Sequence, residues 1–155
     1  MQGDIIKRVQ DYLDKFNMGL KPLEFEEDTS TCELAARALG VEVGQIAKSI
    51  LFLADGEPVL IVASGDVKIK GGKLKKIMGA SKVKMADMET VLKVTGYAVG
   101  GVCPLALPQE LKILLEDTMH RFPVVYTAAG TPRSALPVTM EQLVVITGGE
   151  WADLA

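Results

Sequence analysis

Two apolar runs separated by a short polar turn constrain the fold of this chain more than any other feature. The runs cover 48–53 (KSILFL) and 58–63 (PVLIVA), and both are rich in β-branched and other large apolar residues. Between them lies Asp55-Gly56-Glu57, and Asp-Gly is a favoured dipeptide in the tight turn of a β-hairpin. The pattern predicts two adjacent antiparallel strands, largely buried, at the centre of a sheet.

Other segments surround this hairpin with helices and further strands. Apolar residues at three- and four-residue spacing predict a helix over 4–18, and Ser30-x-x-Glu33 predicts a capped helix that ends at Gly40. Helices are also expected at 72–78, 87–94 and 139–148, and strands at 82–84, 111–115, 124–128, 134–138 and 151–154. Helices and strands intermingle without regular βαβ alternation. The expected fold class is therefore α/β (α+β), with a mixed, curved, partly barrel-like sheet flanked by helices.

The composition fits one domain over residues 1–155. A chain of this length buries roughly 70% of the surface that its extended form exposes, which allows a core without disulfides or a structural metal. Cys32 and Cys103 lie far apart, with no CxxC or Cys/His cluster around them, so neither a zinc site nor a secreted disulfide framework is indicated. The sequence shows neither a signal peptide nor an apolar run of ~20 residues that could span a membrane. We expect a cytoplasmic protein that uses no metal, cofactor or membrane.

Positive charge is concentrated in one segment of the chain. Seven lysines and no acidic residue lie between positions 68 and 84, although the whole chain has a net charge of −3. Such asymmetry is expected of a domain that meets a polyanion at one defined place. A solvated helix face kept for solubility is the alternative reading of the same run. The residues expected to contact nucleic-acid phosphates are Lys68, Lys70, Lys73, Lys75 and Lys76.

Several common catalytic motifs are missing from the sequence. It has no phosphate-binding loop of the form G-x-x-x-x-G-K-[ST], and no GxGxxG, HExxH or GxSxG. The single histidine, His120, has no partner ligands near it in the sequence, so we expect an ordinary surface or half-buried side chain. Metal-dependent catalysis is therefore disfavoured.

The most informative stretch is 95–104 (TGYAVGGVCP). Its paired glycines, Gly100 and Gly101, allow the backbone to approach a ligand closely and to direct N–H groups towards an oxygen, as an oxyanion site requires. Paired glycines before a proline are also typical of a plain tight turn. The loop alone leaves both interpretations open.

From about Thr31 to its end, the chain resembles the YbaK-like, prolyl-tRNA synthetase-associated editing domains, which are trans-acting aminoacyl-tRNA deacylases. The resemblance rests on five segments in order: 31–41 (TCELAARALGV), 44–52 (GQIAKSILF), 62–66 (VASGD), 95–104, and 128–134 (AAGTPRS). Members of that family hydrolyse the ester that joins a wrong amino acid to the 3′ end of a tRNA. The resemblance implies this family's fold and a mischarged tRNA acceptor end as partner. An aminoacyl-tRNA synthetase is a second implied partner, and DNA is not one.

The resemblance also implies a site. Lys48 matches the family's functional lysine, expected to hold the phosphate or ribose of the terminal nucleotide, and Gly100 to Pro104 match its G-x-x-x-P loop. The candidate catalytic residues are thus Lys48, Gly100 and Gly101. The residues expected to bind substrate beside them are Thr31, Ser64, Asp66, Val102, Cys103, Pro104, Gly130 and Ser134. Family members commonly carry a glycine soon after the loop proline, whereas this chain continues Leu105-Ala-Leu, so the amino-acid preference does not follow from the resemblance.

Such a residue set is compatible with ester hydrolysis. An aminoacyl ester is already activated, so its hydrolysis needs positioning and oxyanion stabilisation more than a protein nucleophile. Apolar pockets separate amino acids that differ by one methylene by only ~1–3 kcal/mol, which is why synthetases for small amino acids need a second, hydrolytic site. The predicted function is hydrolysis of a mischarged tRNA, such as a tRNA for proline carrying alanine, cysteine or serine.

Two alternatives stay open at the level of sequence. Cys103 could act as a nucleophile with His120 as its base, although nothing in the sequence places the two side chains together. The chain could also be a non-catalytic module that binds the aminoacylated tRNA end or a synthetase without cleaving the ester, because a fold does not fix a function.

Overall fold

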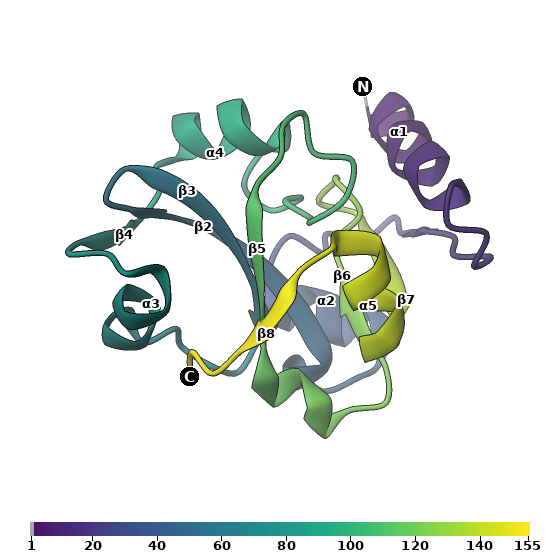
Figure 1. The fold of residues 1–155 in the computed structure, drawn as a ribbon. Coiled ribbons are helices and arrows are strands. Elements are labelled where there is room, and N and C mark those ends of the chain that lie inside the picture. Colours follow the sequence, from purple (N-terminus) through teal and green to yellow (C-terminus); the bar gives the residue numbers. More distant parts are fainter. Residues whose placement is uncertain (1) are drawn as a thin grey trace.

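An eight-stranded mixed sheet with helices around it forms the fold in the computed structural model, which describes residues 2–155 (Figure 1). The strands are β1 (Leu23–Glu24), β2 (Ile46–Ala54), β3 (Glu57–Ser64), β4 (Val83–Met85), β5 (Lys112–Glu116), β6 (Val125–Thr127), β7 (Ser134–Val138) and β8 (Glu150–Ala152). The helices are α1 (Gln2–Asp14), α2 (Cys32–Leu39), α3 (Gly71–Met78), α4 (Met88–Thr95) and α5 (Met140–Thr147), with 3-10 turns η1 (Val43–Gln45) and η2 (Asp117–Arg121). The predicted fold class is confirmed. The strand order is β1-β7-β6-β2-β3-β5-β8, and β4 pairs with β2 outside this order. Within the described residues, the terminal strands β1 and β8 do not pair with each other, so the sheet is not a closed barrel.

The predicted central hairpin is formed by β2 and β3. The two strands pair from Ala47 with Ser64 to Ala54 with Glu57. Asp55 (φ 49°) and Gly56 (φ 85°) make the turn, and positive φ at both central residues is what a two-residue hairpin loop of this twist requires. Alternate residues of β3 enter two different apolar clusters on the two faces of the sheet, which accounts for its uninterrupted apolar run.

The other edge of β2 is shared by two partners. β6 pairs with its first residues, Ile46 and Ala47, in parallel, and β4 pairs with 52–54 in antiparallel orientation. Between these partners, residues 48–51 have no strand neighbour on this edge among the described residues. The sheet therefore has a gap four residues long beside its central strand.

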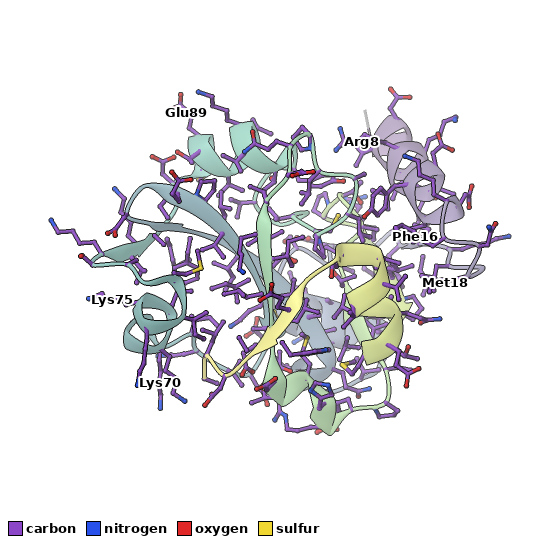
Figure 2. The ribbon with its side chains drawn as sticks, in the orientation of Figure 1. Arg8, Phe16, Met18, Lys70, Lys75 and Glu89 are labelled. Atoms are coloured by element: carbon purple, nitrogen blue, oxygen red, sulfur yellow. The ribbon has the colours of Figure 1, made fainter. Side chains whose placement is uncertain are left out.

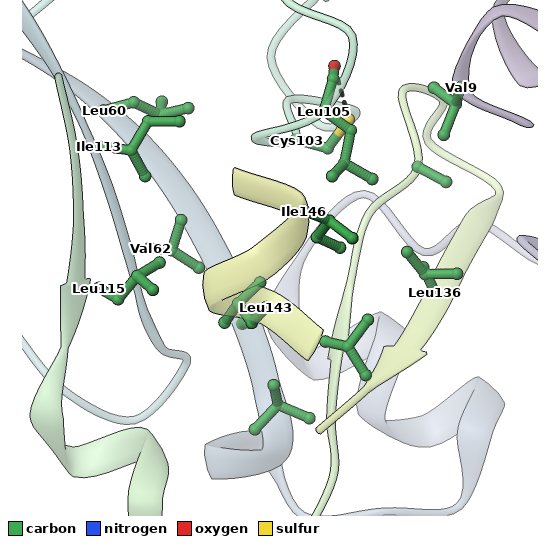
Figure 3. Close-up of a cluster of buried hydrophobic side chains, with 14 of the residues drawn as sticks. Val9, Leu60, Val62, Cys103, Leu105, Ile113, Leu115, Leu136, Leu143 and Ile146 are labelled. Atoms are coloured by element: carbon green, nitrogen blue, oxygen red, sulfur yellow. Dashed lines mark hydrogen bonds between the residues drawn. The ribbon is translucent and has the colours of Figure 1, made fainter. Parts of the chain in front are cut away.

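The larger apolar cluster packs on one face of the sheet under α1, α4 and α5. Figure 3 shows Leu60, Val62 and Leu115 from β3 and β5 beside Leu143 and Ile146 of α5. A second cluster on the other face joins Phe52, Ile61 and Leu114 to Leu74 of α3 and to Leu154 near the C-terminus. Both faces of the central strands are thus buried.

Two helix ends differ from the sequence prediction. The N-cap of α2 is Thr31, whose hydroxyl accepts a hydrogen bond from the Leu34 N–H at 3.1 Å, so the prediction of a Ser30 cap is wrong by one residue. α1 ends at Asp14 rather than 18, and its chain turns through Asn17 in a left-handed conformation. The capping box at the start of α5, between Thr139 and Gln142, is confirmed.

None of the helices among residues 2–155 is long and apolar enough to cross a membrane.

Candidate functional site

A cavity of about 230 Å³ opens beside the gap in the edge of β2. Residues 46–51 of β2 form one side, and the start of α2, the 99–102 loop and the ends of β4, β6 and β7 form the others. The wall is mostly apolar, with a few hydroxyls, one thiol and one lysine. Five of the residues expected from the sequence lie in this wall, namely Thr31, Lys48, Gly100, Val102 and Ser134.

Lys48 is the only lysine in the cavity wall formed by the described residues. Its Nζ donates a hydrogen bond to the Val67 carbonyl at 2.6 Å. A lysine ammonium has three N–H donors, and this bond uses one of them. The side chain is therefore fixed at the cavity while it keeps donors for an anionic or hydroxyl-bearing ligand.

Two glycines allow the segments around Lys48 to pack closely. A Cβ on Gly65 would lie 2.6 Å from the Val43 carbonyl oxygen and 2.9 Å from the Cys32 Sγ. A Cβ on Gly44 would lie 2.9 Å from an oxygen of Asp66. A larger residue at Gly65 would require the backbone to move, because its nearest obstacle is a backbone oxygen, whereas at Gly44 the Asp66 side chain would have to shift. The turn after β3, the start of α2 and η1 therefore pack closely around these two glycines.

Asp66 lies outside the cavity wall and is bound to Arg121. The guanidinium donates to both carboxylate oxygens, at 2.7 and 3.0 Å. These bonds hold the pKa of the Asp66 carboxyl below its usual range. The pair is partly exposed and ties η2 to the turn that carries Val67. Asp66 thus supports the segment that holds Lys48 instead of facing the cavity.

Gly100 brings its loop to the cavity, and Gly101 anchors the same loop. Gly100 has φ 101°, and a Cβ there would lie 3.1 Å from the Cβ of Ser30. The Gly101 N–H donates to the Ala98 carbonyl at 3.0 Å, so this amide is used within the turn. Of the two glycines, Gly100 lies in the cavity wall and Gly101 lies buried behind it.

Of the three residues that follow the glycine pair, one lies in the cavity wall and two lie in the interior. Val102 lies in the cavity wall, whereas Cys103 and Pro104 are buried behind the loop. Burial raises the pKa of the Cys103 thiol to about 11. His120 lies exposed on η2, with its ring 4.0 Å from that of Trp151 and its Nδ1 at 3.0 Å from the Asp117 carbonyl. The structure gives no Cys103–His120 contact among the described residues.

Gly130 and Ser134 shape the loop on the other side of the cavity. A Cβ on Gly130 would lie 2.7 Å from the Tyr97 ring. The Ser134 hydroxyl accepts from the Ala129 N–H at 3.0 Å and donates to the Thr131 carbonyl at 2.9 Å. Its hydrogen bonds are therefore made within the loop. The Thr31 hydroxyl is similarly occupied as the cap of α2.

Sequence reasoning did not select Cys32 and Ser49, which also line the cavity. Burial raises the pKa of the Cys32 thiol, and the nearby Lys48 ammonium offsets part of that rise. The Ser49 hydroxyl oxygen is buried and has no hydrogen-bond partner among the described residues. The hydroxyl of Ser64 is in the same state, but Ser64 is not part of the cavity wall. The sequence did offer one signal for these two residues, because each directly follows a predicted site residue: Cys32 follows Thr31, and Ser49 follows Lys48.

The lysine run begins directly after the carbonyl that holds Lys48. Figure 2 shows Lys70 and Lys75 at the α3 end of the molecule. Lys68, Lys70, Lys75 and Lys76 are exposed, whereas Lys73 pairs with Asp153 at 2.9 Å and donates to the Ala155 carbonyl. The run is therefore a solvent-facing basic surface in which one of the five expected lysines is tied to the C-terminus. No three His, Cys, Asp or Glu side chains of residues 2–155 gather where they could hold a metal ion.

Comparisons with known proteins match this architecture. The family of the aminoacyl-tRNA editing domain matches residues 26–146. A crystal structure described as a proposed trans-editing enzyme for prolyl-tRNA synthetase superposes with a TM-score of 0.90 at 36% identity, covering 97% of this chain and 96% of the other.

The sequence of this chain is also similar to those of two proteins with a named activity. EbsC of Enterococcus faecalis, whose name proposes a Cys-tRNA(Pro)/Cys-tRNA(Cys) deacylase, is 26% identical over 145 residues, which are 92% of this chain and 88% of EbsC. The proline–tRNA ligase of Citrifermentans bemidjiense is 35% identical over 102 residues, which are 64% of this chain and only 18% of the ligase. The matched family segment contains the cavity, the lysine that faces it and both loops that border it, and the chain belongs to the aminoacyl-tRNA editing domain family.

Proposed function

We propose that the protein is a trans-acting deacylase that hydrolyses the ester of a mischarged tRNA. A tRNA for proline that carries alanine, cysteine or serine is the proposed substrate class. The observation that carries the proposal is the joint placement of Lys48 and Gly100 in the wall of one small cavity, in a chain of the editing-domain family. The names of EbsC and of the solved relative support the same reaction and point to prolyl-tRNA synthetase as the enzyme whose errors are corrected.

The reaction needs a water oxygen to attack the ester carbonyl carbon. The bond from that carbon to the ribose oxygen then breaks, one proton from the water goes to the ribose oxygen, and the amino acid leaves as a carboxylate after its second water-derived proton is released to solvent. Negative charge develops on the carbonyl oxygen, and N–H groups that face this oxygen stabilise it. The loop that contains Gly100 and Val102 forms part of the wall from which backbone donors would act.

Lys48 supplies positive charge at the cavity. A compact ammonium suits a phosphate oxygen or a ribose hydroxyl of the terminal nucleotide. The Val67 carbonyl holds the ammonium at 2.6 Å, and the exposed lysine run begins one residue later. This continuity supports a path on which the acceptor strand contacts the lysine run while its 3′ end enters the cavity.

The apolar lining of the cavity supports an amino acid with an uncharged side chain. Its wall includes Val91, Val99 and Val102, and the volume is about 230 Å³. An apolar pocket gains only ~1–3 kcal/mol from each additional methylene that fits. Selection for a small amino acid such as alanine therefore depends on excluding larger side chains more than on apolar contacts with the small one.

The test is release of labelled amino acid from tRNA for proline charged with alanine, cysteine, serine or proline. Wild-type protein should release one small wrong amino acid, and Lys48→Ala should slow this release by ~100-fold, the scale expected when the reacting group of a substrate is misplaced by about 1 Å. Lys112→Ala is the matched control, because Lys112 pairs with Glu150 at 3.4 Å and lies outside the cavity wall. Binding of charged tRNA with an unchanged ester lifetime would instead identify a non-catalytic binding module.

A further inference from the structure

The edge of β2 at the cavity carries polar backbone groups that no strand covers. In a strand, the N–H and the C=O of one residue point to the same edge of the sheet, and those of the next residue point to the opposite edge. The Ile46 carbonyl accepts from the Gly65 N–H on the β3 side, at 2.7 Å, and the Leu51 carbonyl accepts from the Ala86 N–H on the β4 side, at 2.9 Å. Counting in steps of two from Leu51, Ser49 directs both of its backbone groups away from β3.

Three backbone groups therefore face the gap between β6 and β4: the N–H and C=O of Ser49 and the N–H of Leu51. Within residues 2–155, neither strand neighbour reaches them, because β6 pairs only with Ile46 and Ala47 and β4 begins its pairing at Phe52. Both Ser49 and Leu51 line the cavity. The cavity thus contains a short unpaired piece of sheet edge.

The Ser49 side chain adds an independent sign of a polar ligand. Its hydroxyl oxygen is buried, and it has no hydrogen-bond partner among the described residues. Buried polar groups in folded proteins are hydrogen-bonded in the large majority of cases. An unpartnered hydroxyl beside an unpaired strand edge, both in one cavity wall, is the arrangement expected where a polar ligand group binds.

We propose that this edge binds the aminoacyl group of the substrate as one residue of an added strand. The inference rests on the proposed deacylase function and names how the amino acid is recognised. In a hydrogen-bonded antiparallel pair, each residue donates its N–H to the other residue's C=O. An aminoacyl ester has its ammonium and carbonyl on either side of one Cα, as a peptide residue does. Its ammonium donates to the Ser49 C=O, and its carbonyl oxygen accepts from the Ser49 N–H.

This pairing also selects the L-isomer and sets where the side chain of the substrate lies. Residues that face each other in an antiparallel pair point their side chains to the same face of the sheet. The substrate side chain would therefore lie on the face that holds the side chain of Ser49, in the apolar part of the cavity near Leu51 and Val91. Because inversion at the Cα exchanges the positions of the side chain and the hydrogen, the D-isomer fails to place its side chain there.

The test uses a stable substrate analogue, 3′-(L-alanylamino)-3′-deoxyadenosine, in which an amide replaces the ester. Its matched control is the propanoyl derivative, which lacks only the ammonium. We expect the alanyl compound to bind at least ten times more tightly than the propanoyl compound and than the D-alanyl isomer. In ¹⁵N-labelled protein, hydrogen exchange of the Ser49 amide should slow on binding. The amides of Lys48 and Ile50, which face β3, should keep their exchange rates.

Equal affinity for the alanyl and propanoyl compounds, or binding without slower exchange at Ser49, would overturn the proposal. The same protein is assayed with mischarged tRNA, so that the two proposals fail separately. Recognition as described, without release of any amino acid, would refute the deacylase function and leave the strand-like recognition in place. Release of amino acid, with equal binding of the propanoyl compound, would refute the recognition and leave the deacylase function in place.

Discussion

Gly101 and Gly130 hold the two loops beside the cavity in direct backbone contact. A Cβ on Gly101 would lie 2.7 Å from the Gly130 carbonyl oxygen and 2.9 Å from the Cα of Thr131. Both obstacles are backbone atoms, so neither can rotate away. We expect Gly101→Ala to lower the free energy of unfolding by about 1–3 kcal/mol, as overpacking of a filled interior does. Because Gly100 and Val102 flank this position, the variant should also release amino acid more slowly.

The matched control for Gly101→Ala is Gly72→Ala. Gly72 lies in α3, and nothing lies within 4 Å of its added Cβ. Alanine is the better helix former by about 0.5–1 kcal/mol, so this variant should be as stable as the wild type or more stable. Urea unfolding of both variants checks the pair. Equal stability of Gly101→Ala and wild type would mean that the two loops can separate without cost.

The exposed lysines are predicted to act through charge. Neutralising Lys70, Lys75 and Lys76 together should weaken binding of charged tRNA and lower the slope of log K against log salt by up to about 0.7–0.9 for each phosphate that the lysines no longer neutralise. Hydrolysis at saturating tRNA should stay near the wild-type rate, since the cavity does not include these residues. Filter binding between about 50 and 200 mM salt gives the slope. An unchanged slope would make the run a solvated surface.

The two cysteines should differ sharply towards a thiol reagent. Cys103 has no exposed surface, and burial raises its pKa to about 11. Cys32 is partly exposed in the cavity wall, and the Lys48 ammonium opposes the rise of its pKa. We expect native protein to react at one thiol, and Cys32→Ala to abolish this reaction. Reagent counts before and after denaturation check it. Rapid labelling of native Cys32→Ala protein would contradict the described burial of Cys103.

The sequence was sufficient for the parts of the fold that depend on neighbouring residues. The β2–β3 hairpin could be predicted because its two runs and its turn are contiguous. The start of α2 was misplaced because Ser30 and Thr31 are both good caps, and only tertiary packing distinguishes them. In the folded chain Ser30 lies under Gly100, which leaves Thr31 to accept from Leu34.

The site could be predicted less completely, because it depends on contacts between distant segments. Lys48 and Gly100 lie in one wall, as the resemblance implied, but the gap beside Ser49 exists only where β6 stops pairing with β2 after Ala47. β6 follows β2 by more than seventy residues, and no local pattern fixes how far their pairing extends. The direction of Cys103 was equally hidden, since a loop residue can face the cavity or the core.

Asp66 and Arg121 provide a prediction for stability as a function of pH. The Arg121 guanidinium lowers the pKa of Asp66 in the folded protein below its ordinary value of 3.8. The stabilisation from this pair is therefore fully present above the unfolded pKa and is lost as the pH falls through the lower folded pKa. Both side chains are about two-fifths exposed, at 41% and 44%, so solvent screening limits the contribution to about 1 kcal/mol or less.

Asp66→Asn should thus be slightly less stable than wild type at neutral pH, and the difference should shrink once the pH falls below 3.8. Urea unfolding over an acidic pH series checks this, with Asp11→Asn as control, because Asp11 pairs with Lys7 on the exposed face of α1 and far from Val67 in the chain. Asp66 lies in the turn that presents the Val67 carbonyl to Lys48. The rate of amino-acid release by Asp66→Asn should therefore fall by more than its small loss of stability accounts for. Asp11→Asn should keep the wild-type stability and the wild-type rate of release. Wild-type release by Asp66→Asn would show that the turn holds Lys48 without the arginine pair.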